Sequence, residues 1–171
     1  DIAEKASKAP EEFAYDLILE EDGYQGFIFP WQVPKEESDD TIARTVTHPR
    51  MMIASDGLYN VAHSHPRSQG CFARVLGDFV REKSAISLEQ AVYKMSGFQA
   101  ERFRLGKRGQ LKEKYSADVV IFDPSTVASR STFENPNQAP VGIPHVIVNG
   151  QPVIRHGRPT SDTPGKVIPR S

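Results

Sequence analysis

The chain has 171 residues, a formal net charge of −1 at pH 7, and 38% hydrophobic residues. Its acidic and basic residues are interspersed, and nucleic-acid binding needs a broad basic field, so we expect neither DNA nor RNA as a partner. No apolar run approaches the roughly 20 residues that a membrane-spanning helix needs, so we expect no membrane partner.

Cys71 is the single cysteine of the chain. This excludes an intramolecular disulfide framework and fits a reducing compartment, so we expect a cytoplasmic protein. Residue 1 is Asp and no signal-peptide pattern follows it, so we expect a cut within a longer chain or a processed end.

The first half of the chain alternates helices with short apolar strands. An amphipathic helix is predicted from Pro10 to Asp22, and a buried strand at 26–29. A second helix opens near Ser38 and ends before Pro49, because proline disfavours a helical residue ahead of it. Residues 51–54 then read as another strand. This order is typical of a parallel sheet that is covered by helices.

Two further helices are predicted after a loop at 57–70. The first has apolar residues at i, i+3, i+4, i+7 and i+8 over 72–80, the spacing of a helix with one buried face. The second begins at Ser87, which forms a capping box with Gln90, and ends before Gly97.

Beyond Gly109 the pattern changes to strands at 117–122, 145–149 and 152–155, the last two joined by the hairpin signal Asn149-Gly150. Residues 123–143, rich in Pro, Ser, Thr and Asn, are expected to form a long surface excursion. The chain therefore divides into an α/β part, 1–108, and a β part, 109–171. The β part has too few strands to close a sheet by itself, so we expect it to complete a sheet that begins elsewhere.

Asp56 is the first candidate for chemistry. It follows the strand at 51–54 directly, and the carboxyl end of a parallel strand faces the ligand crevice. A carboxylate there can bind a divalent metal or accept a proton from a metal-bound water. The alternative is a plain turn, since Asp and Gly are favoured turn residues.

The loop 63–67, His-Ser-His-Pro-Arg, supplies further candidates. Arg67 suits an anionic substrate because a guanidinium binds a carboxylate through two parallel hydrogen bonds, although it could be an ordinary surface arginine. His63 and His65 have the His-x-His spacing of metal ligands but lie in a polar loop, which favours fixing the loop or binding substrate. Cys71 precedes a helix, a place that can lower a thiol pKa, but a small buried residue is the better interpretation.

Several motifs together resemble one family in their order and spacing. That family is the N-acyl-D-amino-acid deacylases, or D-aminoacylases, of the amidohydrolase superfamily. The resemblance runs from about residue 40 to the C-terminus. It rests on Ser55-Asp56-Gly57, His65-Pro66-Arg67, Phe72–Gly77, Ser87–Arg102, Ala117–Pro124, Thr132–Glu134 and Val148–Gly150.

The resemblance implies the C-terminal part of a metal-dependent (β/α)8 barrel, of the triosephosphate-isomerase type, plus strands of a small β domain. It implies hydrolysis of N-acyl-D-amino acids to a D-amino acid and a carboxylic acid. Asp56 matches the catalytic aspartate, which takes a proton from zinc-activated water, passes it to the leaving nitrogen and is a weak or second-metal ligand. Arg67, with His65 beside it, matches the arginine that binds the substrate α-carboxylate.

The family's other zinc ligands lie on earlier barrel strands, which this chain lacks. Zinc needs about three protein ligands in a catalytic site, so we expect Asp56 alone not to retain the metal and the chain alone to be inactive. The missing N-terminal barrel portion is then a partner, in cis or in trans. Two alternatives stay open: a cyclic-amide hydrolase of the same superfamily, and a non-catalytic module that completes a partner's barrel or sheet.

Overall fold

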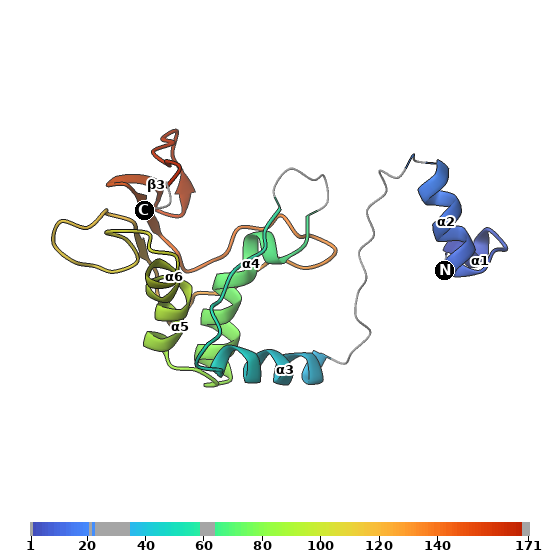
Figure 1. Ribbon diagram of the computed structural model, residues 1–171, viewed down its shortest axis with the longest axis horizontal. Helices are drawn as coiled ribbons and strands as arrows, with labels where there is room; N and C mark the ends of the chain where they lie inside the picture. Colours follow the sequence, from blue (N-terminus) through green and yellow to red (C-terminus); the bar gives the residue numbers. More distant parts are fainter. Residues whose placement is uncertain (1, 21, 23–34, 59–63, 169–171) are drawn as a thin grey trace. The chain divides into compact units, whose positions relative to one another are not determined.

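The computed structural model describes residues 2–20, 22, 35–58 and 64–168 (Figure 1). The chain splits into two compact units, residues 1–35 and residues 36–171, and each is considered by itself. The strand predicted at 26–29 lies outside the described residues, as does His63.

The first unit contains two helices, α1 (Ile2–Lys5) and α2 (Pro10–Glu20). Helix α2 confirms the predicted amphipathic helix. The apolar side chains of Phe13, Leu17 and Ile18 on its predicted inner face are each half-buried. An exposed ion pair between Lys8 and Asp16, with 2.6 Å between Nζ and Oδ2, ties the turn before α2 to the helix.

The helical part of the second unit begins with α3 (Lys35–Thr47). Helix α4 (Arg67–Arg74) continues directly into a π-helix, η1 (Val75–Glu82), and α5 (Leu88–Met95) is followed by α6 (Gly97–Arg102). The predicted capping box is confirmed in part, because the Ser87 hydroxyl accepts a hydrogen bond of 3.2 Å from the Gln90 N–H.

The helix predicted over 72–80 exists, but its inner face differs from the prediction at one position. Ala73, Val75, Leu76 and Phe79 are buried, whereas Phe72 is exposed. A π-helix closes its backbone hydrogen bonds over five residues instead of four, and this changes which positions share a face. An α-helical period therefore assigned Phe72 wrongly.

The strand predicted at 51–54 is wrong in the described structure. The segment has no regular secondary structure and pairs with no strand among the described residues. Its backbone bonds instead to α5 and α6: the Ile53 N–H donates to Lys94 O at 3.0 Å, and Gln99 Nε2 donates to Ile53 O at 2.7 Å. A strand requires a neighbouring strand to accept its ladder of hydrogen bonds, and none of the described residues supplies one.

The sheet of this unit has four strands in the order β1-β2-β3-β4, all antiparallel. The strands are β1 (Val119–Ile121), β2 (His145–Val148), β3 (Gln151–Arg155) and the short β4 (Arg158–Pro159). The predicted hairpin is confirmed: Asn149 and Gly150 have φ values of +47° and +82°, as a tight turn between two strands requires.

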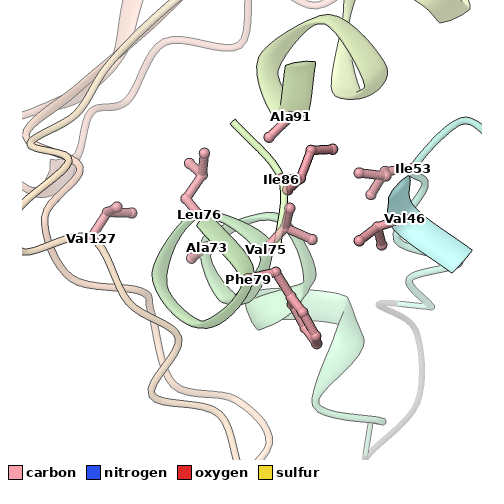
Figure 2. Close-up of a cluster of buried hydrophobic side chains, with 9 residues drawn as sticks. All are labelled: Val46, Ile53, Ala73, Val75, Leu76, Phe79, Ile86, Ala91 and Val127. Carbon is pink, nitrogen blue, oxygen red and sulfur yellow. The ribbon is translucent and has the colours of Figure 1, made fainter. Parts of the chain in front are cut away.

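The hydrophobic core lies around α4 and η1, with α3 and residue 53 on one side and α5 on another (Figure 2). It consists of Val46, Ile53, Ala73, Val75, Leu76, Phe79, Ile86, Ala91 and Val127. Val127 was unexpected, because it lies in the segment predicted as a surface excursion. Its side chain is fully buried, so this segment belongs partly to the core.

Small side chains on the helix let the segment around Val127 approach closely. A Cβ atom on Gly77 would lie 2.9 Å from the carbonyl oxygen of Val127, and one on Gly70 would lie 2.1 Å from Ser129 Oγ. Arg81 fixes the same segment, because its Nη1 donates to Val127 O at 2.6 Å and to Pro124 O at 3.3 Å.

A buried charge joins α3 to the long helix. The Asp39 side chain is 2% exposed and lies 2.6 Å from Arg74 Nη2 and 3.5 Å from Lys83 Nζ. Because a buried carboxylate is costly without cationic partners, these two cations offset the cost of burying Asp39. None of the described helices is both long and apolar enough to cross a membrane.

Replacing Gly77 by alanine tests the close approach of the Val127 segment. The added methyl group meets a backbone oxygen that cannot rotate away, so we expect the free energy of unfolding to fall by about 1–3 kcal/mol, as in other overpacked cores. Urea denaturation of G77A measures this. The matched control is Gly165→Ala, since nothing lies within 4 Å of a Cβ at Gly165. Equal stability of G77A and the native chain contradicts the packing described here.

Candidate active site

Asp56 and Arg67, predicted as site residues, lie in contact. Arg67 Nη2 is 2.7 Å from Asp56 Oδ2, and Arg67 Nε donates to the backbone oxygen of Asp56 at 2.9 Å. Both side chains are accessible, with 42% of Arg67 and 79% of Asp56 exposed. An exposed pair contributes at most about 1 kcal/mol, so its significance lies in geometry more than in stability.

The first turns of α4 hold the loop that carries Asp56. Ser68 Oγ accepts from the Leu58 N–H at 3.2 Å and donates to Leu58 O at 3.1 Å, while Cys71 Sγ donates to Ala54 O at 3.4 Å. With Arg67, three residues of α4 therefore bind the backbone from 54 to 58. Asp56 itself has a φ of +48°, a left-handed conformation that these contacts maintain.

Arg67 keeps one edge of its guanidinium group available. Nε and Nη2 face Asp56, whereas Nη1 has no hydrogen-bond partner among the described residues. A guanidinium group can bind a carboxylate bidentately through two neighbouring N–H groups. The Nη1–Nη2 edge can thus bind a second carboxylate while the Nε–Nη2 edge holds Asp56.

His65 lies beside this pair and is bonded to it through the backbone. Its Nδ1 accepts a hydrogen bond of 3.1 Å from the Arg67 N–H, and its ring forms a T-shaped contact with the Phe133 ring, with 5.0 Å between centroids. Burial lowers the pKa of His65, the Arg67 cation lowers it further, and Asp56 opposes both. His65 is therefore positioned to fix the loop, as one of its predicted roles requires.

Cys71 has the properties of a packing residue. Its side chain is half-buried, and burial raises the pKa of the thiol against the opposing effect of Arg74 and Arg67. A nucleophilic cysteine needs the thiolate, which a raised pKa disfavours.

The described residues do not form a metal site by themselves. No group of three or more His, Cys, Asp or Glu side chains in that part of the chain lies close enough to hold a metal ion. A catalytic zinc ion needs about three protein ligands. Asp56 alone does not fit a zinc ion, and any zinc site that includes it needs ligands from outside the described residues.

Two residues that the sequence did not single out position the segment before Asp56. Lys94 is 6% exposed, and its Nζ donates to the backbone oxygens of His48 and, at 2.9 Å, Met51. Gln99 binds Ile53 O. The sequence did carry one signal for Lys94: it lies one helical turn after Ala91, so it is on the buried face of α5.

A shallow groove elsewhere on this unit is separate from these residues. It is lined by Leu88, Val92, Phe122 and neighbouring residues of α5, and contains neither Asp56 nor Arg67. It is not part of the candidate active site.

The pKa of His65 provides a test of this geometry, because its two charged neighbours act in opposite directions. Arg67→Gln removes a cation and should raise the pKa of His65, whereas Asp56→Asn removes an anion and should lower it. An NMR titration of the His65 ring measures both. Asp162→Asn, a change of a distant exposed acid, is the control. A shift of the same sign in both variants contradicts the arrangement.

Comparisons with known proteins agree with the resemblance read from the sequence. The amidohydrolase family matches residues 17–154. D-aminoacylase of Alcaligenes xylosoxydans xylosoxydans is 48% identical over 120 residues, which cover 70% of this chain and 25% of that protein.

Solved structures agree as well. N-acyl-D-glutamate deacylase of Bordetella bronchiseptica, complexed with zinc and a phosphonate inhibitor, is 46% identical with a TM-score of 0.72 over 78% of this chain and 28% of that one. A D-aminoacylase with a binuclear metal centre is 42% identical with a TM-score of 0.70, covering 72% of this chain and 26% of its own.

The chain spans about a quarter of the length of these relatives. Within that quarter, the likeness confirms the predicted resemblance to the deacylases and the predicted fold class, part of a barrel enzyme with a small β domain. The chain belongs to the amidohydrolase family.

Proposed function

We propose that this chain is the part of a zinc-dependent N-acyl-D-amino-acid deacylase that supplies the proton carrier and the substrate anchor. The observation that carries the proposal is the contact of Arg67 with Asp56, which leaves one edge of the guanidinium group open. Two relatives that share over 40% identity with this chain are deacylases of N-acyl-D-amino acids by name.

In this proposal the open edge of Arg67 binds the α-carboxylate of an N-acyl-D-amino acid. Because the other edge holds Asp56, the scissile amide is kept near a carboxylate. Asp56 takes a proton from the attacking water, and the water oxygen forms a bond to the amide carbonyl carbon. The C–N bond then breaks, and Asp56 delivers the proton to the leaving nitrogen. The products are a carboxylic acid and a D-amino acid. His65 keeps the Arg67 loop in place.

The remaining parts of the site come, in this proposal, from a barrel portion in cis or in trans. That portion would provide the zinc ligands, since the described residues provide no such set. We assign residues 1–108 to the last barrel units and 109–171 to the small β domain. A single unpaired Cys71 fits a cytoplasmic location.

A second candidate function is a non-catalytic module that completes a partner's sheet. Strand β1 is an edge strand, and its Val120 and Ile121 side chains are 54% and 47% exposed. Edge strands pair readily with other chains. The two candidate functions differ in one expectation: once the partner is present, hydrolysis requires Asp56 if the chain is part of the enzyme, but not if it is a non-catalytic module.

The purified chain with added zinc should not hydrolyse N-acyl-D-amino acids, because the described residues lack a set of zinc ligands. A ninhydrin assay for released D-amino acid measures this, with a full-length D-aminoacylase as the positive control. If turnover by the purified chain rises with zinc, the chain contains a complete active site and the proposal that it supplies only part of one is refuted.

A chimera tests the proposed roles directly. In it, residues 36–168 replace the matching segment of the Alcaligenes D-aminoacylase, and we expect hydrolysis of N-acyl-D-amino acids but not of their L-enantiomers. Asp56→Asn should lower kcat by about 10²- to 10⁴-fold, the usual contribution of a proton-transfer group. Arg67→Glu should raise KM for the acidic substrate by at least about tenfold, as loss of a charge-assisted anchor does.

The matched controls in the chimera are Asp162→Asn for Asp56→Asn and Arg158→Glu for Arg67→Glu, which make the same changes of charge at other exposed positions. Both should leave kcat and KM within about twofold of the unmodified chimera. An unchanged KM in R67E removes the anchoring role, and an active D56N chimera favours the non-catalytic module.

A further inference from the structure

The loop between Ser129 and Pro140 contacts the candidate active site, although it lies in the part of the chain assigned to the β domain. Two of its contacts reach residues 64 and 65, next to Arg67 in the sequence. Asn137 Oδ1 accepts a hydrogen bond of 2.6 Å from Ser64 Oγ, and the Phe133 ring packs edge-on against His65 at 5.0 Å. In Figure 1 this orange loop lies beside the beginning of α4.

The base of this loop is closed and fixed to the helix. The backbones of Ala128 and Val141 exchange two hydrogen bonds of 3.3 and 3.0 Å. Val127, next to this closure, is fully buried against η1, and Arg81 binds its carbonyl oxygen at 2.6 Å. The small face of the helix at Gly70 brings Ser129 into direct contact. The loop therefore starts from a defined place on α4 and η1.

The loop also has its own hydrogen bonds. Ser131 Oγ donates to Gln138 O at 3.0 Å, and the Thr132 N–H donates to Asn135 O at 3.2 Å. The Asn135 N–H in turn donates to Thr132 Oγ1 at 3.0 Å. A loop that is closed at its base and bonded within presents Phe133 and Asn137 in fixed positions.

From these side chains a short series of contacts leads to the substrate anchor. Ser64 is 4% exposed and His65 follows it directly, and His65 Nδ1 accepts the hydrogen bond from the Arg67 N–H. Arg67 then holds Asp56. We propose that Phe133 and Asn137 are positioning residues for Arg67, acting through Ser64 and His65. This inference rests on the proposed function, because the proposed function gives Arg67 its role as the substrate anchor.

The first arm of the test uses the 171-residue chain without any activity. The Arg67 Nε–H, which is bonded to Asp56 O, is followed by NMR as it exchanges with water. Phe133→Ala and Asn137→Ala should each speed this exchange by about tenfold, because they release the loop that fixes Arg67. Phe133→Tyr keeps an aromatic ring and Asn137→Asp keeps a hydrogen-bond acceptor, so the Arg67 Nε–H of each variant should exchange at the native rate.

Phe103→Ala is the matched control, since Phe103 is an exposed phenylalanine, 58% accessible, that lies outside the loop and directly follows α6. It should leave the exchange unchanged. A double-mutant cycle adds specificity: after Ser64→Ala, the change N137A should have no further effect, because its partner is already gone. Exchange that is equally slow in F133A, N137A and the native chain overturns the proposal.

The second arm uses the active chimera. F133A and N137A should raise KM for an N-acyl-D-amino acid by about tenfold while kcat changes by less than about threefold, because a displaced anchor weakens substrate binding. A fall in kcat at constant KM overturns the positioning role. If the chimera hydrolyses nothing while the Arg67 exchange responds as expected, the proposed function fails and the structural coupling of the loop to Arg67 stands.

Discussion

The position of Asp56 depends on how the backbone polar groups from 51 to 58 are satisfied. In a strand these groups would bond to a neighbouring strand, and the described residues provide none for this segment. Side chains take that place here. Lys94 and Gln99 bind the carbonyl groups of Met51 and Ile53, and α4 binds those that follow. The aspartate is thus held between two helical layers, even though its side chain is exposed to solvent.

This arrangement explains why α4 and η1 occupy the centre of the second unit. One side of the helix packs against α3 and α5, and the small residues Gly70 and Gly77 let the segment around Val127 approach closely. Its first turn binds the Asp56 loop through Arg67 and Ser68. Packing and site are therefore coupled through one element, so a change that tilts this helix moves both charged groups together. Interiors at close-packed density transmit such shifts instead of absorbing them.

Local rules predicted the elements that depend on nearby residues. The Ser87 cap and the Asn149-Gly150 turn are fixed by interactions within a few positions, and both were found as expected. The strand at 51–54 was predicted wrongly because strand formation depends on a partner, which no local pattern reports. Val127 was missed because a single apolar residue in a polar segment carries no periodicity. In the site, the sequence pattern predicted Asp56 and Arg67 as candidates, but their contact with each other could be seen only in the fold. Phe133 and Asn137 belong to no recognisable motif, so the sequence pattern did not predict their place near the site.

The exposure of the charged pair indicates what a complete site has to add. In water, a carboxylate and a guanidinium group attract each other weakly, and solvent competes for every donor that Arg67 offers. Enzymes obtain strong electrostatic effects by excluding water from fixed dipoles and charges. With 79% of the Asp56 side chain accessible, the described residues form only one wall of such an enclosure. On the proposal made here, the portion that brings the zinc ligands also covers Asp56 and Arg67, so closing the site and binding the metal are one structural event.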